Sequence, residues 1–157
     1  MQSIRQLKKV GVIVARFQVP DLHAGHRYLV DHVSQIHSDT LIVLGYHGGL
    51  RTDTNPLTVE ERVEMIRESY KDPNIKIVSL RDHPFSHDRW SVWLDELVKE
   101  KFGGEREADM YGGAHDSFLG VYSGKHTRVP IARFDETSGT AQRKAIVRSS
   151  RASGKIL

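Results

Sequence analysis

The chain alternates short apolar runs with longer amphipathic segments, and this alternation limits its fold more than any other feature. Residues 8–15 and 40–45 read KKVGVIVA and TLIVLG, and residues 75–80 read IKIVSL. Short runs in which nearly every residue is apolar and many are β-branched are typical of strands buried on both faces. Residues 107–113 and 129–134 have weaker strand patterns.

Helical patterns fill the gaps between these strands. They cover residues 24–37, 58–70 and, with looser boundaries, 88–102. In the second, Thr58 and Glu61 have the spacing of a capping box, which predicts a helix start there. Strands that alternate with helices favour right-handed crossovers and a mostly parallel sheet. We therefore predict an α/β fold in which a mostly parallel sheet of about five strands is flanked by helices.

Composition narrows the class of protein. The 157 residues suit one domain, 1–157, because no repeat or linker interrupts them. The absence of cysteine excludes disulfides and thiolate metal sites. We expect no signal peptide, no membrane partner and a cytoplasmic location, because no apolar run is long enough. The net charge of +3 is spread along the chain, which suits an anionic substrate better than nucleic acid.

The stretch ARFQVPDLHAGH, residues 15–26, follows the first predicted strand. Ligands of open α/β sheets bind beyond the carboxyl ends of the strands, and a helix that begins near Ala24 would aim free N–H groups there. Gly25 would let a phosphate approach the backbone, and His23 and His26 would donate to its oxygens. We predict a nucleotide-phosphate site. A zinc site is the alternative, but it needs a third ligand that no local spacing supplies.

A second phosphate cradle is predicted near the C-terminus, in the sequence TSGTAQR. The hydroxyls of Thr137, Ser138 and Thr140 would cap a helix, with Arg143 one turn inside it. Such a convergence suits the β- and γ-phosphates of a triphosphate. Simple capping beside a solvated arginine is the alternative.

Three other residues are candidates from their positions at strand ends. Gly112 ends the fourth strand and would admit a flat ligand, while Asp116 would hold a ribose hydroxyl or merely cap the next helix. Arg16 ends the first strand. Because an unpaired buried arginine is costly, we expect a phosphate partner for it.

The segment ARFQ…HAGH resembles the HxGH nucleotidyltransferase superfamily, which has a Rossmann-like fold. Its RFQ resembles nicotinamide-nucleotide adenylyltransferases of the archaeal and bifunctional bacterial type. NPLTVEERVEMI, RDHPFSHDRW and TSGTAQR match further family segments in order, so the resemblance runs from about residue 10 to the C-terminus. The chain departs from the family pattern at Ala15, in the longer loop before His23, and at Ser86 and His87.

The resemblance implies an enzyme that transfers AMP from ATP to nicotinamide mononucleotide, with Mg²⁺ held mainly by the ATP phosphates. It implies catalytic roles for His23, His26, Arg16 and Arg143. It implies ATP contacts from Ala15, Phe17, Gln18, Gly25, Gly112, Asp116, Thr137, Ser138 and Thr140. It implies acceptor contacts from Trp90, His87 and Ser86, and no metal ligand among the side chains. The other tryptophan, Trp93, is expected in the core with Leu94 and Leu97.

Other functions stay open on the sequence alone. The same chemistry would serve nicotinate mononucleotide, a sugar or alditol phosphate, or a cytidylyl donor. Ala15 and the longer loop are also compatible with a non-catalytic nucleotide sensor. An RNA-binding module is suggested only by the basic balance. A homo-oligomer is compatible with the sequence.

Overall fold

The computed structural model describes residues 9–17, 22, 24–46, 57–103, 106–113 and 117–131. Its strands are β1 (Val10–Ala15), β2 (Asp39–Tyr46), β3 (Ile75–Arg81), β4 (Ala108–Gly113) and β5 (Thr127–Ile131). Its helices are α2 (Ala24–Ile36), α3 (Val59–Ser69), α4 (His87–Phe102) and the short α5 (Ser117–Val121). The predicted strands and helices within these residues are confirmed, with boundaries shifted by one to three residues.

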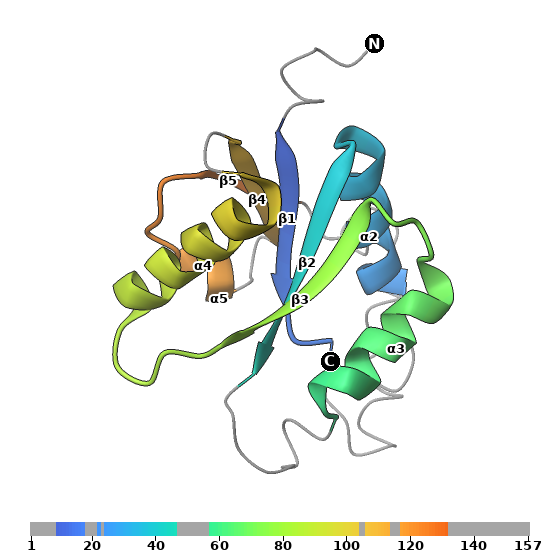
Figure 1. The fold of residues 1–157 in the computed structure, drawn as a ribbon, viewed down its shortest axis with the longest axis horizontal. Coiled ribbons are helices and arrows are strands. Elements are labelled where there is room, and N and C mark those ends of the chain that lie inside the picture. Colours follow the sequence, from blue (N-terminus) through green and yellow to red (C-terminus); the bar gives the residue numbers. More distant parts are fainter. Residues whose placement is uncertain are drawn as a thin grey trace, which may run out of the picture.

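The five strands form one sheet in the order β3-β2-β1-β4-β5, and every neighbouring pair is parallel. The first two crossovers run outward from β1 through α2 and α3. The third, through α4, carries the chain from β3 back past β2 and β1 to β4 (Figure 1). The result is the predicted α/β, Rossmann-like arrangement, in which strand order reverses between β1 and β4.

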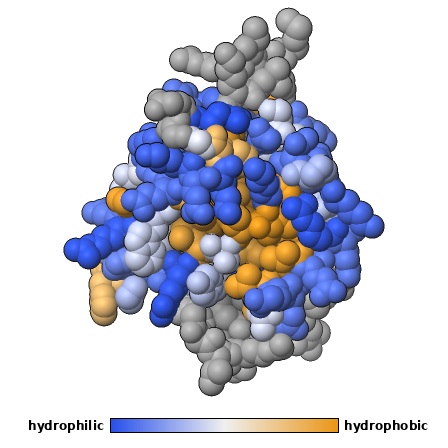
Figure 2. All heavy atoms as spheres, in the orientation of Figure 1, coloured by the Kyte–Doolittle hydropathy of each residue, from blue (hydrophilic) through white to orange (hydrophobic). Residues whose placement is uncertain are grey.

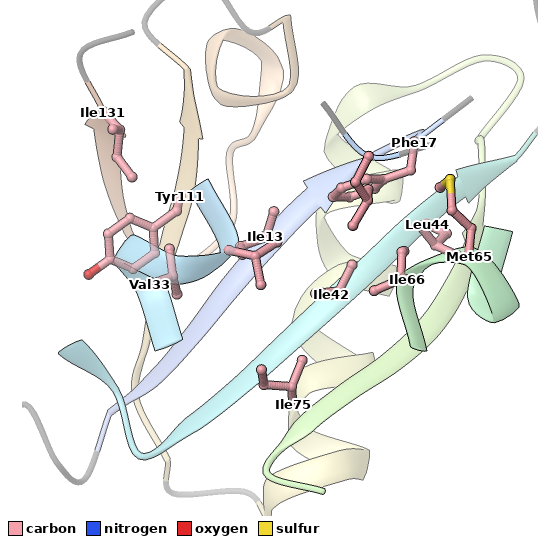
Figure 3. Close-up of a cluster of buried hydrophobic side chains, with 12 residues drawn as sticks. Ile13, Phe17, Val33, Ile42, Leu44, Met65, Ile66, Ile75, Tyr111 and Ile131 are labelled. Carbon is pink, nitrogen blue, oxygen red and sulfur yellow. The ribbon is translucent and has the colours of Figure 1, made fainter. Parts of the chain in front are cut away.

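Two apolar clusters hold the helices against the sheet. The first joins α2 and α3 to one face, where Val33 and Ile66 pack with Ile13 and Ile42 (Figure 3). The second joins α4 and α5 to the other face, around Leu94. Successive residues of β1 alternate between the clusters, as pleating requires of a strand covered on both faces. Apolar atoms also reach the surface beside α4 (Figure 2). None of the helices in the described ranges has the length and apolar character of a membrane span.

The capping box predicted at the start of α3 is confirmed. The Thr58 backbone N–H donates to Glu61 Oε1 at 2.9 Å, and the Glu61 backbone N–H donates to Thr58 Oγ1 at 3.1 Å. The buried face of the helix is less apolar than its periodicity predicts. It consists of Arg62, Met65 and Ile66, so a guanidinium lies where a hydrophobic side chain is usual.

The prediction that Trp93 belongs to the core is wrong. The buried positions of α4 are Ser91, Leu94 and Val98, and Trp93 lies about 100° around the helix from Leu94. Its side chain is 38% exposed, and its ring lies 4.8 Å from the ring of His83. Trp93→Ala is therefore not a core truncation.

Gly11 of β1 lies against Val33 of α2 and His37, which follows that helix. A Cβ at this position would clash with Val33 Cγ1 and would lie 2.7 Å from the His37 ring. The helix therefore approaches the strand only because position 11 has no side chain.

We predict that Gly11→Ala lowers the free energy of unfolding by about 1–3 kcal/mol, because the added methyl overpacks the junction between helix and strand. Urea titration measures the loss. Gly120→Ala is the matched control: no heavy atom lies within 4 Å of its added Cβ, so it should be neutral or slightly stabilising. Equal midpoints for the two variants would contradict the prediction.

Candidate active site

The strand order reverses between β1 and β4, and ligands of open α/β sheets bind at the carboxyl ends of the strands beside such a reversal. Ala15 is the last residue of β1, and the buried Gly112 lies one residue before the end of β4. Helix α2 begins at Ala24, as predicted, so its first turn contains Gly25 and His26. The first turn of a helix has free N–H groups and a positive dipole end, which favour an anion.

Phe17, two residues after the end of β1, has a left-handed backbone conformation. Its φ is +52°, the only positive φ of a residue other than glycine in the described chain, and its side chain is 2% exposed. Its ring lies in the first cluster with Leu44 and Met65 (Figure 3). The same ring lies 4.7 Å from the His26 ring, with the planes tilted by 40°. Phe17 thus orients His26 through packing, and left-handed backbone of this kind concentrates at functional sites.

The environment of Arg16 differs from the prediction. The side chain is 44% exposed rather than buried, and Nη2 donates to Asp82 Oδ2 at 2.5 Å. It is exposed because it follows the last residue of β1 and emerges from the edge of the sheet. The argument that burial demands a phosphate partner is therefore wrong, although a guanidinium is present at the expected edge.

Arg62 lies beneath this pair and connects three backbone segments. Its Nη1 donates to the carbonyl oxygens of Arg16 (2.7 Å) and Gly45 (2.8 Å), and its Nε donates to that of Thr58 (3.3 Å). The residue is 1% exposed. Burial lowers the pKa of Arg62, the nearby Arg16 charge lowers it further, and the Asp82 carboxylate opposes both effects. A buried arginine of this kind is tolerated because its Nη1 and Nε groups donate to carbonyl oxygens.

Arg16, Arg62 and Asp82 carry one net positive charge, which the Glu60 carboxylate near Arg62 offsets in part, at the edge of the sheet that also receives the first turn of α2. An excess positive charge beside free helix N–H groups attracts phosphate. The described residues contain no group of three or more His, Asp or Glu side chains arranged to hold a metal ion.

The predicted acceptor residues gather at the start of α4. The Ser86 hydroxyl is the N-cap and accepts from the Arg89 backbone N–H at 3.2 Å, while the His87 side chain is exposed. Trp90 is half-buried, and its ring meets Phe118 of α5 edge-on at 5.5 Å. Trp90 thus already has a packing role, and Ser86 a capping role.

Several predicted site residues lie outside the described residues: Gln18, His23, Asp116, Thr137, Ser138, Thr140 and Arg143. Their roles stay predictions.

Sequence reasoning missed two residues of this edge, Arg62 and Asp82. Arg62 carried a signal, since a charged residue falls on the apolar face of α3, four residues before Ile66. Asp82 carried none, because its partner is 66 residues away in the sequence.

The chain is similar in sequence to nicotinamide-nucleotide adenylyltransferase from Halorubrum lacusprofundi, with 29% identity over 89 residues. The match covers 55% of this chain and 47% of that protein. No protein-family model matches the chain.

Solved structures agree on the fold. A bifunctional NMN adenylyltransferase/ADP ribose pyrophosphatase from Francisella tularensis superposes with a TM-score of 0.70 at 19% identity, over 90% of this chain and 42% of that one. A NadR protein in complex with NAD and AMP-PNP superposes with a TM-score of 0.61 at 18% identity, over 93% of this chain and 43% of that one.

The predicted resemblance to nicotinamide-nucleotide adenylyltransferases is thus confirmed, and the proteins that this chain resembles are nucleotidyltransferases. The chain spans less than half the length of these relatives.

We predict that Arg62→Met lowers the free energy of unfolding by about 2–4 kcal/mol, because it leaves buried carbonyl oxygens without donors. Chemical denaturation at neutral pH measures the loss. Arg89→Met, which changes an exposed arginine of α4, should stay within about 0.5 kcal/mol of wild type. A loss below about 1 kcal/mol at Arg62 would mean that water replaces the guanidinium.

Proposed function

We propose that this protein is a nucleotidyltransferase that transfers AMP from ATP to nicotinamide mononucleotide, giving NAD and pyrophosphate. The proposal rests chiefly on one arrangement. The first turn of α2 with His26 and the Arg16 guanidinium both lie at the carboxyl edge of the sheet, beyond the end of β1. The similarity to the adenylyltransferase from Halorubrum lacusprofundi supplies the choice of substrates.

In the proposed reaction, an oxygen of the acceptor's 5′-phosphate attacks the α-phosphorus of ATP in line. A new P–O bond forms as the bond from the α-phosphorus to the bridging oxygen breaks. Pyrophosphate leaves with that electron pair. The acceptor phosphate is already an anion near neutral pH, so the reaction needs no protein base.

Catalysis would then depend on positioning and on stabilising charge. His26 would donate to the α-phosphate from the first turn of α2, held in place by the Phe17 ring. Arg16 would meet the phosphate chain, with His23 beside His26 and Arg143 on the outer phosphates. Ala15, Gly25 and Gly112 would approach the nucleotide through their backbones.

A divalent cation would be held in this site mainly by the phosphates of ATP. Asp82 is engaged by Arg16, and the described residues contribute no three-carboxylate cluster. Mg²⁺ would neutralise phosphate charge when bound with ATP. One structural neighbour is a complex with AMP and a Mn ion.

The test is pyrophosphate release from ATP and Mg²⁺, measured without acceptor and with a panel of phosphorylated acceptors. We expect release with nicotinamide mononucleotide to exceed release with nicotinate mononucleotide or an alditol phosphate. Faster release with another acceptor would keep the chemistry and change the substrate. No release with any acceptor, in protein that binds ATP by calorimetry, would identify a nucleotide sensor instead.

His26→Ala provides the catalytic control for this assay. Removing one donor to a developing oxyanion costs about 10²- to 10³-fold in turnover. We expect that loss at saturating ATP, with a much smaller change in the Michaelis constant for ATP. Turnover within twofold of wild type would remove His26 from the proposed site.

Trp90 tests the acceptor. If the nicotinamide ring stacks on its indole, binding of the mononucleotide should quench tryptophan fluorescence. Trp90→Ala should weaken acceptor binding by about 1–2 kcal/mol and leave ATP binding unchanged, and Trp90→Phe should keep part of the affinity. Trp93→Ala, at the exposed tryptophan, should leave acceptor binding unchanged. A Trp90→Ala variant that melts early but binds the mononucleotide normally would reduce Trp90 to a packing residue.

A further inference from the structure

We propose that Asp82 is a positioning residue for Arg16: it holds the guanidinium at the phosphate edge and sets the charge presented there. This inference rests on the proposed function, because it assigns Asp82 a part in the same phosphate chemistry. The observation that carries it is the Arg16–Asp82 ion pair, which joins residues that follow β1 and β3.

Strand β2 lies between these two strands in the sheet, so the pair must cross its end (Figure 1). Gly45 lies in β2 where the two side chains meet. A Cβ there would lie 3.7 Å from Asp82 Oδ1 and 3.8 Å from Arg16 Nη1. The pair thus lies directly over a position without a side chain, and a bulky residue at position 45 would displace it.

Both partners have fixed backbones. The Asp82 backbone N–H donates to the carbonyl oxygen of Tyr46, the last residue of β2, at 2.7 Å. The Arg16 carbonyl oxygen accepts from Arg62 at 2.7 Å. These two hydrogen bonds hold the backbones. The ion pair with the Asp82 carboxylate also restrains the long side chain of Arg16, which otherwise has many rotamers.

The pair is not explained by stability. The two side chains are 44% and 35% exposed, and ion pairs in that range contribute little to folding. A guanidinium has five N–H donors, so one carboxylate leaves others for a phosphate. Asp82 also offsets one of the two positive charges of Arg16 and Arg62, which limits how strongly the site holds ATP before reaction.

The test is a double-mutant cycle between Asp82→Asn and Arg16→Ala, measured in turnover and in ATP affinity. With Arg16 present, Asp82→Asn should lower kcat about 10- to 100-fold, because the guanidinium is no longer held in place. It should tighten ATP binding by about threefold, because one nearby negative charge is lost at about 6 Å in water. A merely structural residue would not give weaker turnover together with tighter binding.

The loss of kcat should disappear in the Arg16→Ala background. The gain in ATP affinity should be larger there, because the lost carboxylate charge acts on ATP directly and no positioned guanidinium is forfeited. Asp39→Asn is the matched control, because Asp39 pairs with Arg106 at similar exposure but at the first residue of β2, at the opposite edge of the sheet. It should change neither kcat nor ATP affinity. The melting temperature of Asp82→Asn should stay within about 3 °C of wild type.

Equal losses with and without Arg16, or a kcat within twofold of wild type, would overturn the inference. A wild-type protein that releases no pyrophosphate with any acceptor would instead overturn the proposed function. The ATP-affinity cycle then decides alone: a cost of Arg16→Ala that is smaller in the Asp82→Asn background supports the role of Asp82, and equal costs in both backgrounds end it.

Discussion

The carboxyl edge of the sheet depends on the Arg62 guanidinium. Two strand ends and the beginning of α3 meet there, and the carbonyl oxygens of Arg16, Gly45 and Thr58 all accept from this one side chain. The Thr58 oxygen also accepts from the Arg62 backbone N–H at 3.1 Å. Burial makes an unsatisfied carbonyl oxygen costly, so the guanidinium matters most for Arg16 and Gly45. A single planar donor with several N–H groups satisfies all three oxygens without admitting water. The candidate site is thus assembled on backbone that the interior of the protein holds in place.

The third crossover, through α4, decides where the strand order reverses. Because α4 carries the chain from the outermost strand back across the sheet, β1 and β4 become neighbours, and α2 and α5 pack on opposite faces of the sheet. The first turn of α2 and the glycines of β4 both lie at the carboxyl edge beside this reversal. The first two crossovers place β3 beyond β2, so Asp82 reaches Arg16 across the end of β2. The reversal of strand order and the charged pair therefore come from different crossovers.

The sequence predicts most of the scaffold and only part of the site. Apolar runs predict β1, β2 and β3 because doubly covered parallel strands need them, and Thr58 with Glu61 predicts the start of α3 because the capping box is local. The position of His26 is predicted in the same way, because it depends only on where α2 begins.

The failures have a different cause. The prediction that Trp93 lies in the core is wrong because helical periodicity alone does not decide which of two nearby tryptophans faces the sheet. The Arg16–Asp82 pair could not be predicted because it depends on strand order, which a single sequence does not specify. Arg62 lies between these two cases. Its place on the apolar face of α3 can be predicted from the sequence, but the carbonyl oxygens that accept from it cannot.

Phe17 is subject to two demands that no amino acid meets together. The turn after β1 needs a left-handed backbone, which glycine adopts freely and which costs other residues about 1–2 kcal/mol. The interior needs a large ring at the same point, packed on the first cluster and against His26. Glycine would relax the backbone and leave a void, while a β-branched residue would partly fill the void and strain the backbone further. The chain keeps the ring and accepts the strain, so position 17 is a compromise that conventional stabilising substitutions would worsen.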